Sequence, residues 1–173
     1  RTALTNTHNV SFGGAATGAD YRFSFGYQDR EGIVKESGMK KFNARLAGSK
    51  KFLDDRLTLS ANVMLADITD ENAPISNNSG FEGDLMGALL KANPSQAVKD
   101  TAGKFVQPSN TEPNPSAMLA YTKDFTKTLR SMGGVSAEYN ILKGLTFKTV
   151  LGYDRSISNR KAAYSKDLNV TSI

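Results

Sequence analysis

Tyr21 to Gln28 reads YRFSFGYQ, an alternation of aromatic residues with polar or small ones. Tyr21, Phe23, Phe25 and Tyr27 occupy one set of positions, and Arg22, Ser24, Gly26 and Gln28 fall between them. Successive side chains of a β-strand point to opposite faces. The segment therefore predicts a strand with one apolar side and one polar side.

The same period of two recurs in four other segments, and more weakly at about residues 8–14. The apolar positions of the four clear repeats are Phe42, Ala44, Leu46 and Gly48; Leu57, Leu59, Ala61, Val63 and Leu65; Val135, Ala137, Tyr139 and Ile141; and Leu145, Phe147, Thr149, Leu151 and Tyr153. Several of these strands approach the roughly 9–11 residues that a tilted strand needs to cross a bilayer. No stretch approaches the roughly 18 apolar residues of a membrane-spanning helix.

The connections between the expected strands alternate in length. Short ones lie at residues 15–19, around 52–55 and at 142–144, whereas longer ones lie at 29–39 and at about 69–127. Outer-membrane barrels are built in this way, with short periplasmic turns and long extracellular loops. The pattern predicts an all-β fold, an antiparallel transmembrane β-barrel meander with a long extracellular loop.

The long loop contains a helical signal of its own. Phe81, Leu85, Met86, Leu89 and Leu90 recur at helical spacing within residues 81–92, and Asn93-Pro94 ends the pattern. A loop of this length with its own helix is usually functional. We expect substrate or lid contacts from residues in it, which are Asn77, Asn78, Phe81, Glu82 and Asp84.

Residues on the polar side of the strands are expected to line a water-filled lumen. They are Arg22, Gln28, Lys41, Arg45, Arg56, Glu138 and Lys148. In a soluble β-sandwich the same residues would face bulk water, and the apolar sides would meet in a dry core.

Composition excludes several other classes of protein. The chain has 173 residues, no cysteine and a net charge of +5 that is dispersed, which argues against disulfides and against nucleic-acid binding. His8 is the only histidine, and no catalytic constellation or cofactor motif is present, so we predict neither an enzyme nor a cofactor. No metal site is predicted, although Asp67, Asp70 and Glu71 leave two alternatives open, a calcium ion or a solvated acidic rim.

Longer stretches of the sequence resemble a known family. FSFGYQDREGIVKESGMKKFNARL (23–46), FLDDRLTLSANV (52–63), GFEGDLMGALLKANPS (80–95), PSNTEPNPSAMLAYTKD (108–124) and LKGLTFKTVLGYDRS (142–156) are similar to the early barrel of SusC/RagA-family TonB-dependent outer-membrane transporters. The resemblance runs from about residue 5 to 160. It implies a 22-stranded barrel with an N-terminal plug, a SusD-like surface lipoprotein, energy from TonB, and oligosaccharide or peptide cargo.

The resemblance also implies that residues 1–173 are part of a larger barrel. The chain opens at Arg1 without a signal peptide or plug domain, so we expect a fragment of a Gram-negative outer-membrane protein. Two alternative interpretations of the sequence remain, a soluble β-sandwich that binds glycans or acts as an adhesin, and a small structural or passive barrel. Whether residues 161–173 continue the last strand or form a loop also stays open.

Overall fold

The computed structural model describes every residue except 1, 76–83, 108, 110–112 and 170–173. Six strands and two short helices follow one another along the chain. They are β1 (Thr5–Ala16), β2 (Ala19–Glu31), β3 (Gly38–Phe52), β4 (Leu57–Glu71), α1 (Leu85–Lys91), α2 (Pro115–Tyr121), β5 (Thr122–Leu142) and β6 (Leu145–Tyr164).

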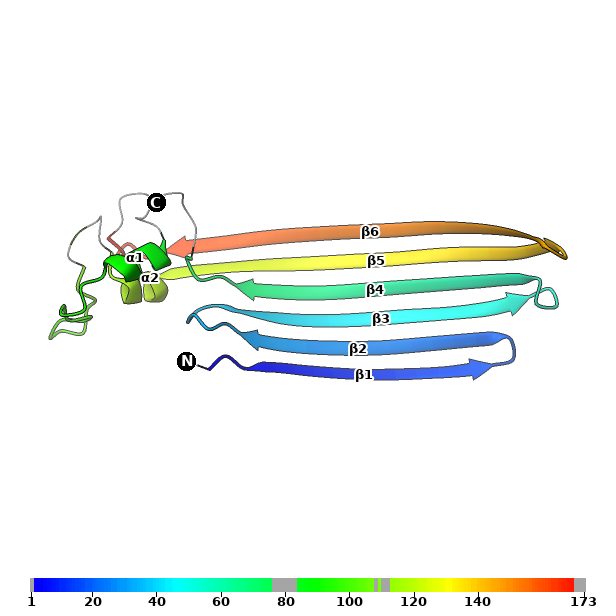
Figure 1. The fold of residues 1–173 in the computed structure, drawn as a ribbon, viewed down its shortest axis with the longest axis horizontal. Helices are drawn as coiled ribbons and strands as arrows, with labels where there is room; N and C mark the ends of the chain where they lie inside the picture. Colours follow the sequence, from blue (N-terminus) through cyan, green and yellow to red (C-terminus); the bar gives the residue numbers. More distant parts are fainter. Residues whose placement is uncertain (1, 76–83, 108, 110–112, 170–173) are drawn as a thin grey trace.

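The strands form one antiparallel sheet in which each strand pairs with its neighbours in sequence, in the order β1-β2-β3-β4-β5-β6 (Figure 1). The pairing register is continuous except for a shift between Asn140 and Leu142. The predicted antiparallel meander is therefore confirmed.

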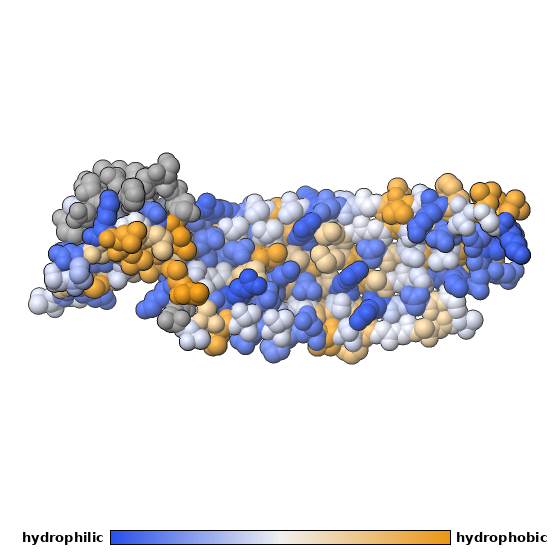
Figure 2. Space-filling model, viewed as in Figure 1, coloured by the Kyte–Doolittle hydropathy of each residue, from blue (hydrophilic) through white to orange (hydrophobic). Residues whose placement is uncertain are grey.

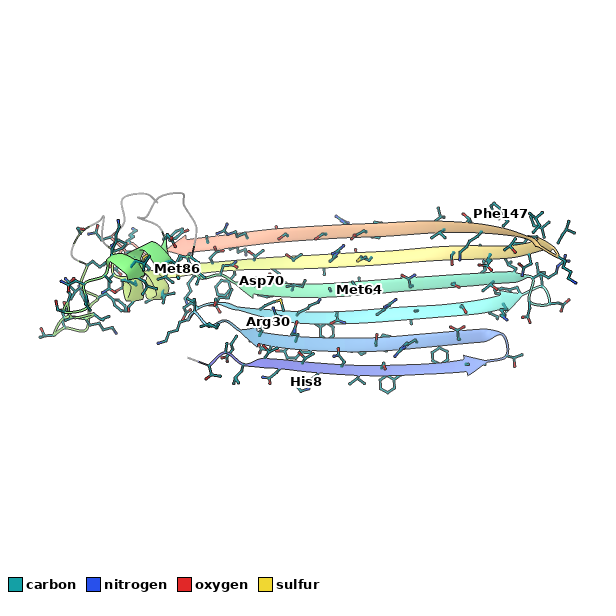
Figure 3. The ribbon with its side chains drawn as sticks, viewed as in Figure 1. His8, Arg30, Met64, Asp70, Met86 and Phe147 are labelled. Carbon is teal, nitrogen blue, oxygen red and sulfur yellow. The ribbon has the colours of Figure 1, made fainter. Side chains whose placement is uncertain are left out.

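Tight turns join the strands at one end of the sheet, which we call the turn end. Gly18 and Gly144 have φ angles of 70° and 88°, which residues with a Cβ rarely adopt, and each closes a short hairpin turn. The β3–β4 turn instead places Leu53, Asp54 and Asp55 in the left-handed region. The longer connections and both helices lie at the opposite end, the loop end (Figures 1 and 3).

The strands extend further toward the loop end than alternation indicated. β4 continues to Glu71 and β5 begins at Thr122, so the connection between them is shorter than the expected 69–127. β6 runs to Tyr164, which places the first residues of 161–173 in the strand. Polar residues occupy both faces in these extensions, so a period of two in hydrophobicity does not reveal them.

A small cap of packed residues covers the loop end of β5 and β6. Its buried core consists of Leu85, Ala88, Ala117, Met118 and Leu168. The expected helix within 81–92 is present as α1, although shorter, and its buried side packs against this core.

Polar side chains hold the cap together. Asn114 caps α2 by accepting from the backbone N–H groups of Ser116 and Ala117, and its amide donates to the carbonyl oxygens of Val98 and Val106 at 2.9 Å each. A single side chain thus fixes the start of α2 and the segment before it.

Asp124 and Arg160 join β5 to β6 close to the cap, since Asp124 follows α2 by three residues. The Asp124 side chain is fully buried, and its carboxylate accepts from the Arg160 guanidinium at 2.5 Å across β5 and β6. The backbone N–H of Asn72 donates to the Asp124 carbonyl oxygen, which brings the end of β4 to the same point.

No helix among the described residues is both long enough and apolar enough to span a membrane.

Replacing Asp124 with Ala is expected to loosen the cap, because it removes a buried side chain and the ion pair that joins β5 to β6 directly after α2. Protease cleavage in residues 92–114 of the folded protein should accelerate roughly tenfold or more. Asp154→Ala is the matched control, since the Arg130–Asp154 pair is half-exposed and far from the cap. Equal cleavage rates for both variants would contradict this role of Asp124.

Candidate functional site

The sheet has an apolar belt on one of its faces, which we call the belt face. The register places Phe12, Phe23, Leu46, Val63, Gly133 and Tyr153 side by side across all six strands. Many belt side chains are exposed in this chain, including Phe12 at 64% and Leu151 at 71%. An exposed apolar surface of this extent marks contact with a partner or with lipid.

The belt ends before the strands do. On the belt face, the positions immediately beyond it toward the loop end are charged, with Asp29 next to Tyr27, Lys40 next to Phe42 and Asp67 next to Leu65. On β4 the apolar positions run from Leu57 to Leu65, a length of about 26 Å at roughly 3.3 Å per residue. The belt is thus a band of limited height.

The belt slopes across the sheet, as its aromatic edges show. The register aligns Tyr27 of β2 with Ile157 of β6, but the aromatic residue at that edge of β6 is Tyr153, four residues nearer the turn end. At the edge of the belt that is nearer the turn end, the register aligns Tyr21 of β2 with Leu151 of β6. The aromatic residue at that edge of β6 is Phe147, again four residues nearer the turn end.

Both edges therefore give the same slope. Four residues are about 13 Å along a strand, and four strand spacings of about 4.8 Å are about 19 Å, so the belt crosses the strands at about 35° from the perpendicular. Strands of outer-membrane barrels tilt by about 35–45°. A belt parallel to a membrane plane would need this slope. Along the membrane normal its height would be about 22 Å on β4 and about 16 Å between the aromatic edges of β2 and β6, which are six residues apart on each strand, compared with roughly 25 Å for the apolar band of such barrels.

The opposite face, the polar face, carries six of the seven residues expected to line a lumen. Arg22, Gln28, Lys41, Arg45, Glu138 and Lys148 all share it by register. The seventh, Arg56, lies in the β3–β4 turn, where its guanidinium donates to the carbonyl oxygen of Ile141 at 3.0 Å. The view in Figure 2 shows mainly hydrophilic residues along the strands and hydrophobic ones gathered over the helical end and near the tight turns.

Charges on the polar face of β5 and β6 are paired across the two strands. Arg130 donates to Asp154 at 2.7 Å, and the Lys148 ammonium lies 3.3 Å from the Glu138 carboxylate. Thr128 and Ser158 hydrogen bond at 3.0 Å between the Arg130 and Arg160 levels. This half of the face is a polar wall whose charges are mutually compensated.

The residues expected to contact substrate or a lid are only partly described. Asn77, Asn78, Phe81 and Glu82 lie outside the described residues. Asp84 caps α1, and its carboxylate accepts from the backbone N–H of Met86 at 3.0 Å. This carboxylate therefore has a role in the helix start.

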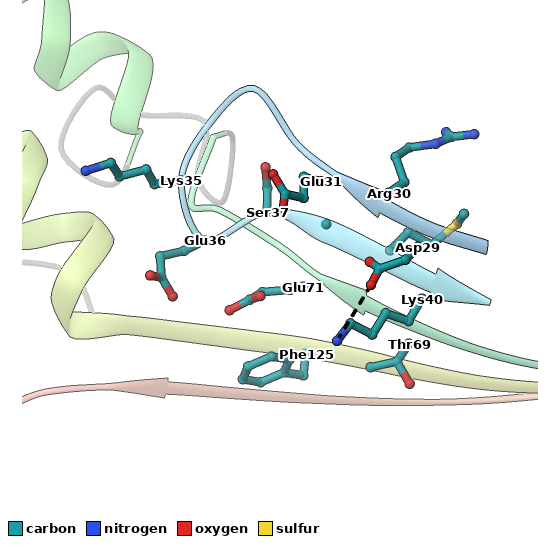
Figure 4. Close-up of a pocket in the computed structure, with 12 residues that line it drawn as sticks. Asp29, Arg30, Glu31, Lys35, Glu36, Ser37, Lys40, Thr69, Glu71 and Phe125 are labelled. Carbon is teal, nitrogen blue, oxygen red and sulfur yellow. Dashed lines mark ion pairs between the residues drawn. The ribbon is translucent and has the colours of Figure 1, made fainter. Parts of the chain in front are cut away.

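An open hollow of about 670 Å³ lies on the belt face at the loop end, beyond the apolar belt (Figure 4). Asp29 and Lys40 form an ion pair at 4.0 Å on this side, whereas Arg30 points to the other face. Glu71 and Phe125 line the floor, and Lys123 pairs with Glu36 of the β2–β3 loop at its rim. The hollow is charged with both signs, as expected for a surface in water.

The acidic residues Asp67, Asp70 and Glu71 do not converge. Asp67 and Glu71 are on the belt face and Asp70 is on the polar face, and the Lys127 ammonium lies 3.5 Å from Asp67. Within the described ranges, His, Asp and Glu side chains form no group of three or more suited to a metal ion. The geometry of these three residues favours a solvated acidic rim.

Asp124 and Arg160 are the pair that sequence analysis missed, because Asp124 fell inside the expected loop. The Arg160 guanidinium hydrogen bonds to the carboxylate and holds the pKa of Asp124 below its ordinary value of 3.8, against the opposing effect of burial. The pair lies at the loop end of the strands, beyond the apolar belt. In the sequence, the feature that could have placed Asp124 on a strand is its spacing from Thr126 and Thr128, which would put the three residues on one strand face.

Comparisons with known proteins agree with the geometry. No family model matches the chain. The chain is 25% identical over 155 residues to the TonB-dependent receptor SusC of Bacteroides thetaiotaomicron, covering 80% of this chain and 16% of that protein. It is 23% identical over 152 residues to the TonB-dependent receptor P39 of Formosa agariphila, covering 87% of this chain and 14% of that protein.

Solved structures show the same fold. The RagAB peptide importer in its closed-closed state matches with a TM-score of 0.73 and 20% identity, over 97% of this chain and 19% of that chain. The open-open state matches with a TM-score of 0.69 over 91% of this chain and 18% of that chain. The chain thus spans less than a fifth of each of these relatives. The predicted resemblance to SusC/RagA-type TonB-dependent receptors is confirmed, and so is the predicted fold class.

The lowered pKa of Asp124 predicts an acid sensitivity of the cap. A carboxylate with a depressed folded pKa stabilises the cap fully above its unfolded pKa, near 3.8, and this stabilisation is lost as the pH falls through the lower folded value. Hydrogen exchange of α2 amides, corrected for the intrinsic rate, should therefore accelerate below about pH 4. Asp124→Asn should remove this step. A pH-independent exchange rate in the unsubstituted protein would contradict the prediction.

Proposed function

We propose that this chain is a stretch of the wall of an outer-membrane TonB-dependent transporter that imports oligosaccharides or peptides. Residues 1–173 would form part of the barrel, and the long extracellular loop would lie between β4 and β5. The observation that carries the proposal is the sloping apolar belt, which has the tilt of a lipid-facing band and ends before the strands do.

The belt face would contact the hydrocarbon of the Gram-negative outer membrane. The residues at its two edges would lie at the membrane–water interfaces, where barrels carry girdles of aromatic residues and the amphipathic rings of tyrosines are favoured. They are Tyr27, Tyr153, Tyr21 and Phe147. The charged positions Asp29, Lys40 and Asp67 would then stand above the outer interface. In a soluble sandwich, by contrast, a core face would stay apolar along the paired length of the strands.

The polar face would line the lumen. A water-filled or protein-filled interior tolerates the paired charges of β5 and β6, which lipid would not. Backbone groups at the outer edges of β1 and β6 would pair with further strands of the barrel, because hydrocarbon offers them no hydrogen bonds.

The loop end would face outside the cell and take part in capturing cargo. Asn77, Asn78, Phe81, Glu82 and Asp84, in and next to the α1 segment, are our proposed contacts for substrate or for a SusD-like surface lipoprotein. Because the Asp84 carboxylate already caps α1, Asp84 would contribute to such contacts by holding the start of α1 in place. The support is the position of α1 at the loop end of the sheet and the names of the relatives.

Transport by such a protein would involve no covalent step. Cargo binding would favour one arrangement of loops and plug over another, and TonB acting on a plug domain would supply the energy to reset it. The relatives are named as receptors and as a peptide importer, which agrees with a function other than catalysis.

Cell fractionation tests the proposal directly. An antibody against residues 80–95 should detect a polypeptide of roughly 100 kDa or more in the outer membrane, released only by detergent. A band near 18.7 kDa in the soluble fraction would overturn the membrane assignment and favour the β-sandwich.

Adjacent residues on β4 offer a matched test of the lipid-facing side. Ala61→Arg places a charge in the middle of the β4 apolar positions and should cost about 2–4 kcal/mol of barrel stability, whereas Asn62→Arg on the polar face should cost far less. The measurement is the urea midpoint of the folded barrel in lipid vesicles. Equal losses for the two variants would contradict the proposed orientation of the sheet.

A further inference from the structure

The polar face divides into two parts that differ in charge pairing. On β5 and β6, Arg130, Lys148 and Arg160 each have a carboxylate partner on the neighbouring strand. On β2 and β3, the cations on the same face have none. They are Arg22, Arg30, Lys41 and Arg45, and no carboxylate of the described residues lies within ion-pair distance of any of them.

The acidic residue on the polar face of these strands, Asp20, does not compensate the cations. It sits at the turn end, where its carboxylate accepts a hydrogen bond from the Ser49 hydroxyl. The remaining polar-face positions of β1 to β3 are occupied by neutral residues apart from Lys51, also at the turn end. On the neighbouring strand β4, Asp70 lies opposite Met39 at the loop end of this face, and no ion pair among the described residues joins it to the cations. Four cations against this one carboxylate leave the electrostatic potential over this part of the face positive.

The four cations form a ladder along the strands. Arg45 lies opposite Ser24, Lys41 opposite Gln28, and Arg30 opposite Met39. With Arg22 they occupy four of the five polar-face levels of β2 from Arg22 to Arg30, and the level of Gly26 and Asn43 between them carries no charge. From the level of Arg22 to that of Arg30 the ladder spans about 26 Å at roughly 3.3 Å per residue. It begins beside the apolar belt of the other face and ends at the loop end.

A hollow of about 430 Å³ lies at the end of the ladder that is nearer the turn end. Arg22 and Arg45 line it together with the neutral polar side chains of Asn9, Ser11, Ser24 and Asn43. Gly26 makes room there, because the side-chain oxygens of Asn9 and Asn43 lie 2.7 and 2.5 Å from the place a Cβ would take. The hollow thus combines two guanidinium groups with amides and hydroxyls that can donate or accept.

We infer that the Arg22–Arg45–Lys41–Arg30 ladder binds a linear oligomer that carries several carboxylates. Guanidinium groups bind carboxylates through paired, charge-assisted hydrogen bonds, and the neutral groups between them suit the hydroxyls or amides of such a chain. A ladder that reaches from the loop end to the middle of the wall gives a multivalent ligand successive positions along one path.

This inference rests on the proposed function, because it places the polar face in a lumen. The ligand chemistry is the repeated carboxylate, which either an acidic oligosaccharide or an acidic peptide can supply. An acidic surface of a protein domain inside the lumen is the competing occupant.

The experiment uses the complete membrane protein that contains this chain, purified as a heat-modifiable barrel. The test variant combines Arg22→Gln, Lys41→Gln and Arg45→Gln, and the matched control combines Glu138→Gln with Lys148→Gln. Calorimetry measures the binding of hexagalacturonate and of hexaglutamate, with a neutral hexasaccharide and hexaglutamine as uncharged probes.

At least one carboxylate oligomer should bind the unsubstituted protein, and the triple variant should weaken that binding about tenfold or more at low salt. The control variant should change it by less than about threefold. Binding of hexagalacturonate alone or of hexaglutamate alone identifies the source of the carboxylates. The loss should shrink in about 0.5 M salt, because screening weakens the charge contribution.

The inference is overturned if neither carboxylate oligomer binds an intact barrel, or if the triple variant binds as tightly as the unsubstituted protein. It is also overturned if the triple variant keeps its affinity but its lumen becomes accessible to protease, which would assign the ladder to a protein domain inside the barrel. Failure of the proposed function is distinct, because the protein would then not behave as a heat-modifiable membrane barrel in any variant.

Discussion

Backbone pairing between neighbouring strands is the constraint on which the other features of this sheet depend. A slip of one residue in any pair would move every side chain of that strand to the opposite face. The register from β1 to β6 is continuous over the length of the belt, and its one shift lies beside the β5–β6 turn. One pairing scheme therefore produces both the apolar belt and the polar face.

The strands are longer than the belt, and this mismatch has a physical meaning. A membrane requires apolar side chains only over its hydrocarbon thickness, so residues beyond that height are free to be charged on both faces. β5 and β6 continue well past the belt and carry the ion pair of Arg160 with the buried Asp124, and the helical cap, at their loop ends. The part of each strand beyond the belt thus supports the loops.

Sequence alone predicted what depends on alternation and missed what does not. The strands and the two faces followed from the period of two, and the meander order from the alternating connection lengths. The period also put Arg22 and Lys41 on one side of the sheet, as the register does. Strand ends near Glu71 and Thr122 were not predicted, because polar residues on both faces carry no periodic signal. Arg56 was assigned to a strand because its position continues the alternation, but the left-handed residues Leu53 to Asp55 place it in the turn. Pairing partners such as Asp124 and Arg160 are 36 positions apart, and only the register brings them together.

Closure of the sheet determines what the unpaired cations mean. On an open sheet in water, Arg22, Lys41 and Arg45 would be hydrated separately, and their mutual repulsion would be weak. Inside a barrel the same side chains would share a confined volume with low-dielectric walls, where fields are focused and like charges interact more strongly. The compensated half of the face, on β5 and β6, avoids this repulsion through its own carboxylates. In the part of the chain that the structure describes, the β2–β3 half has no such partners, so an anionic occupant would relieve the repulsion among its cations.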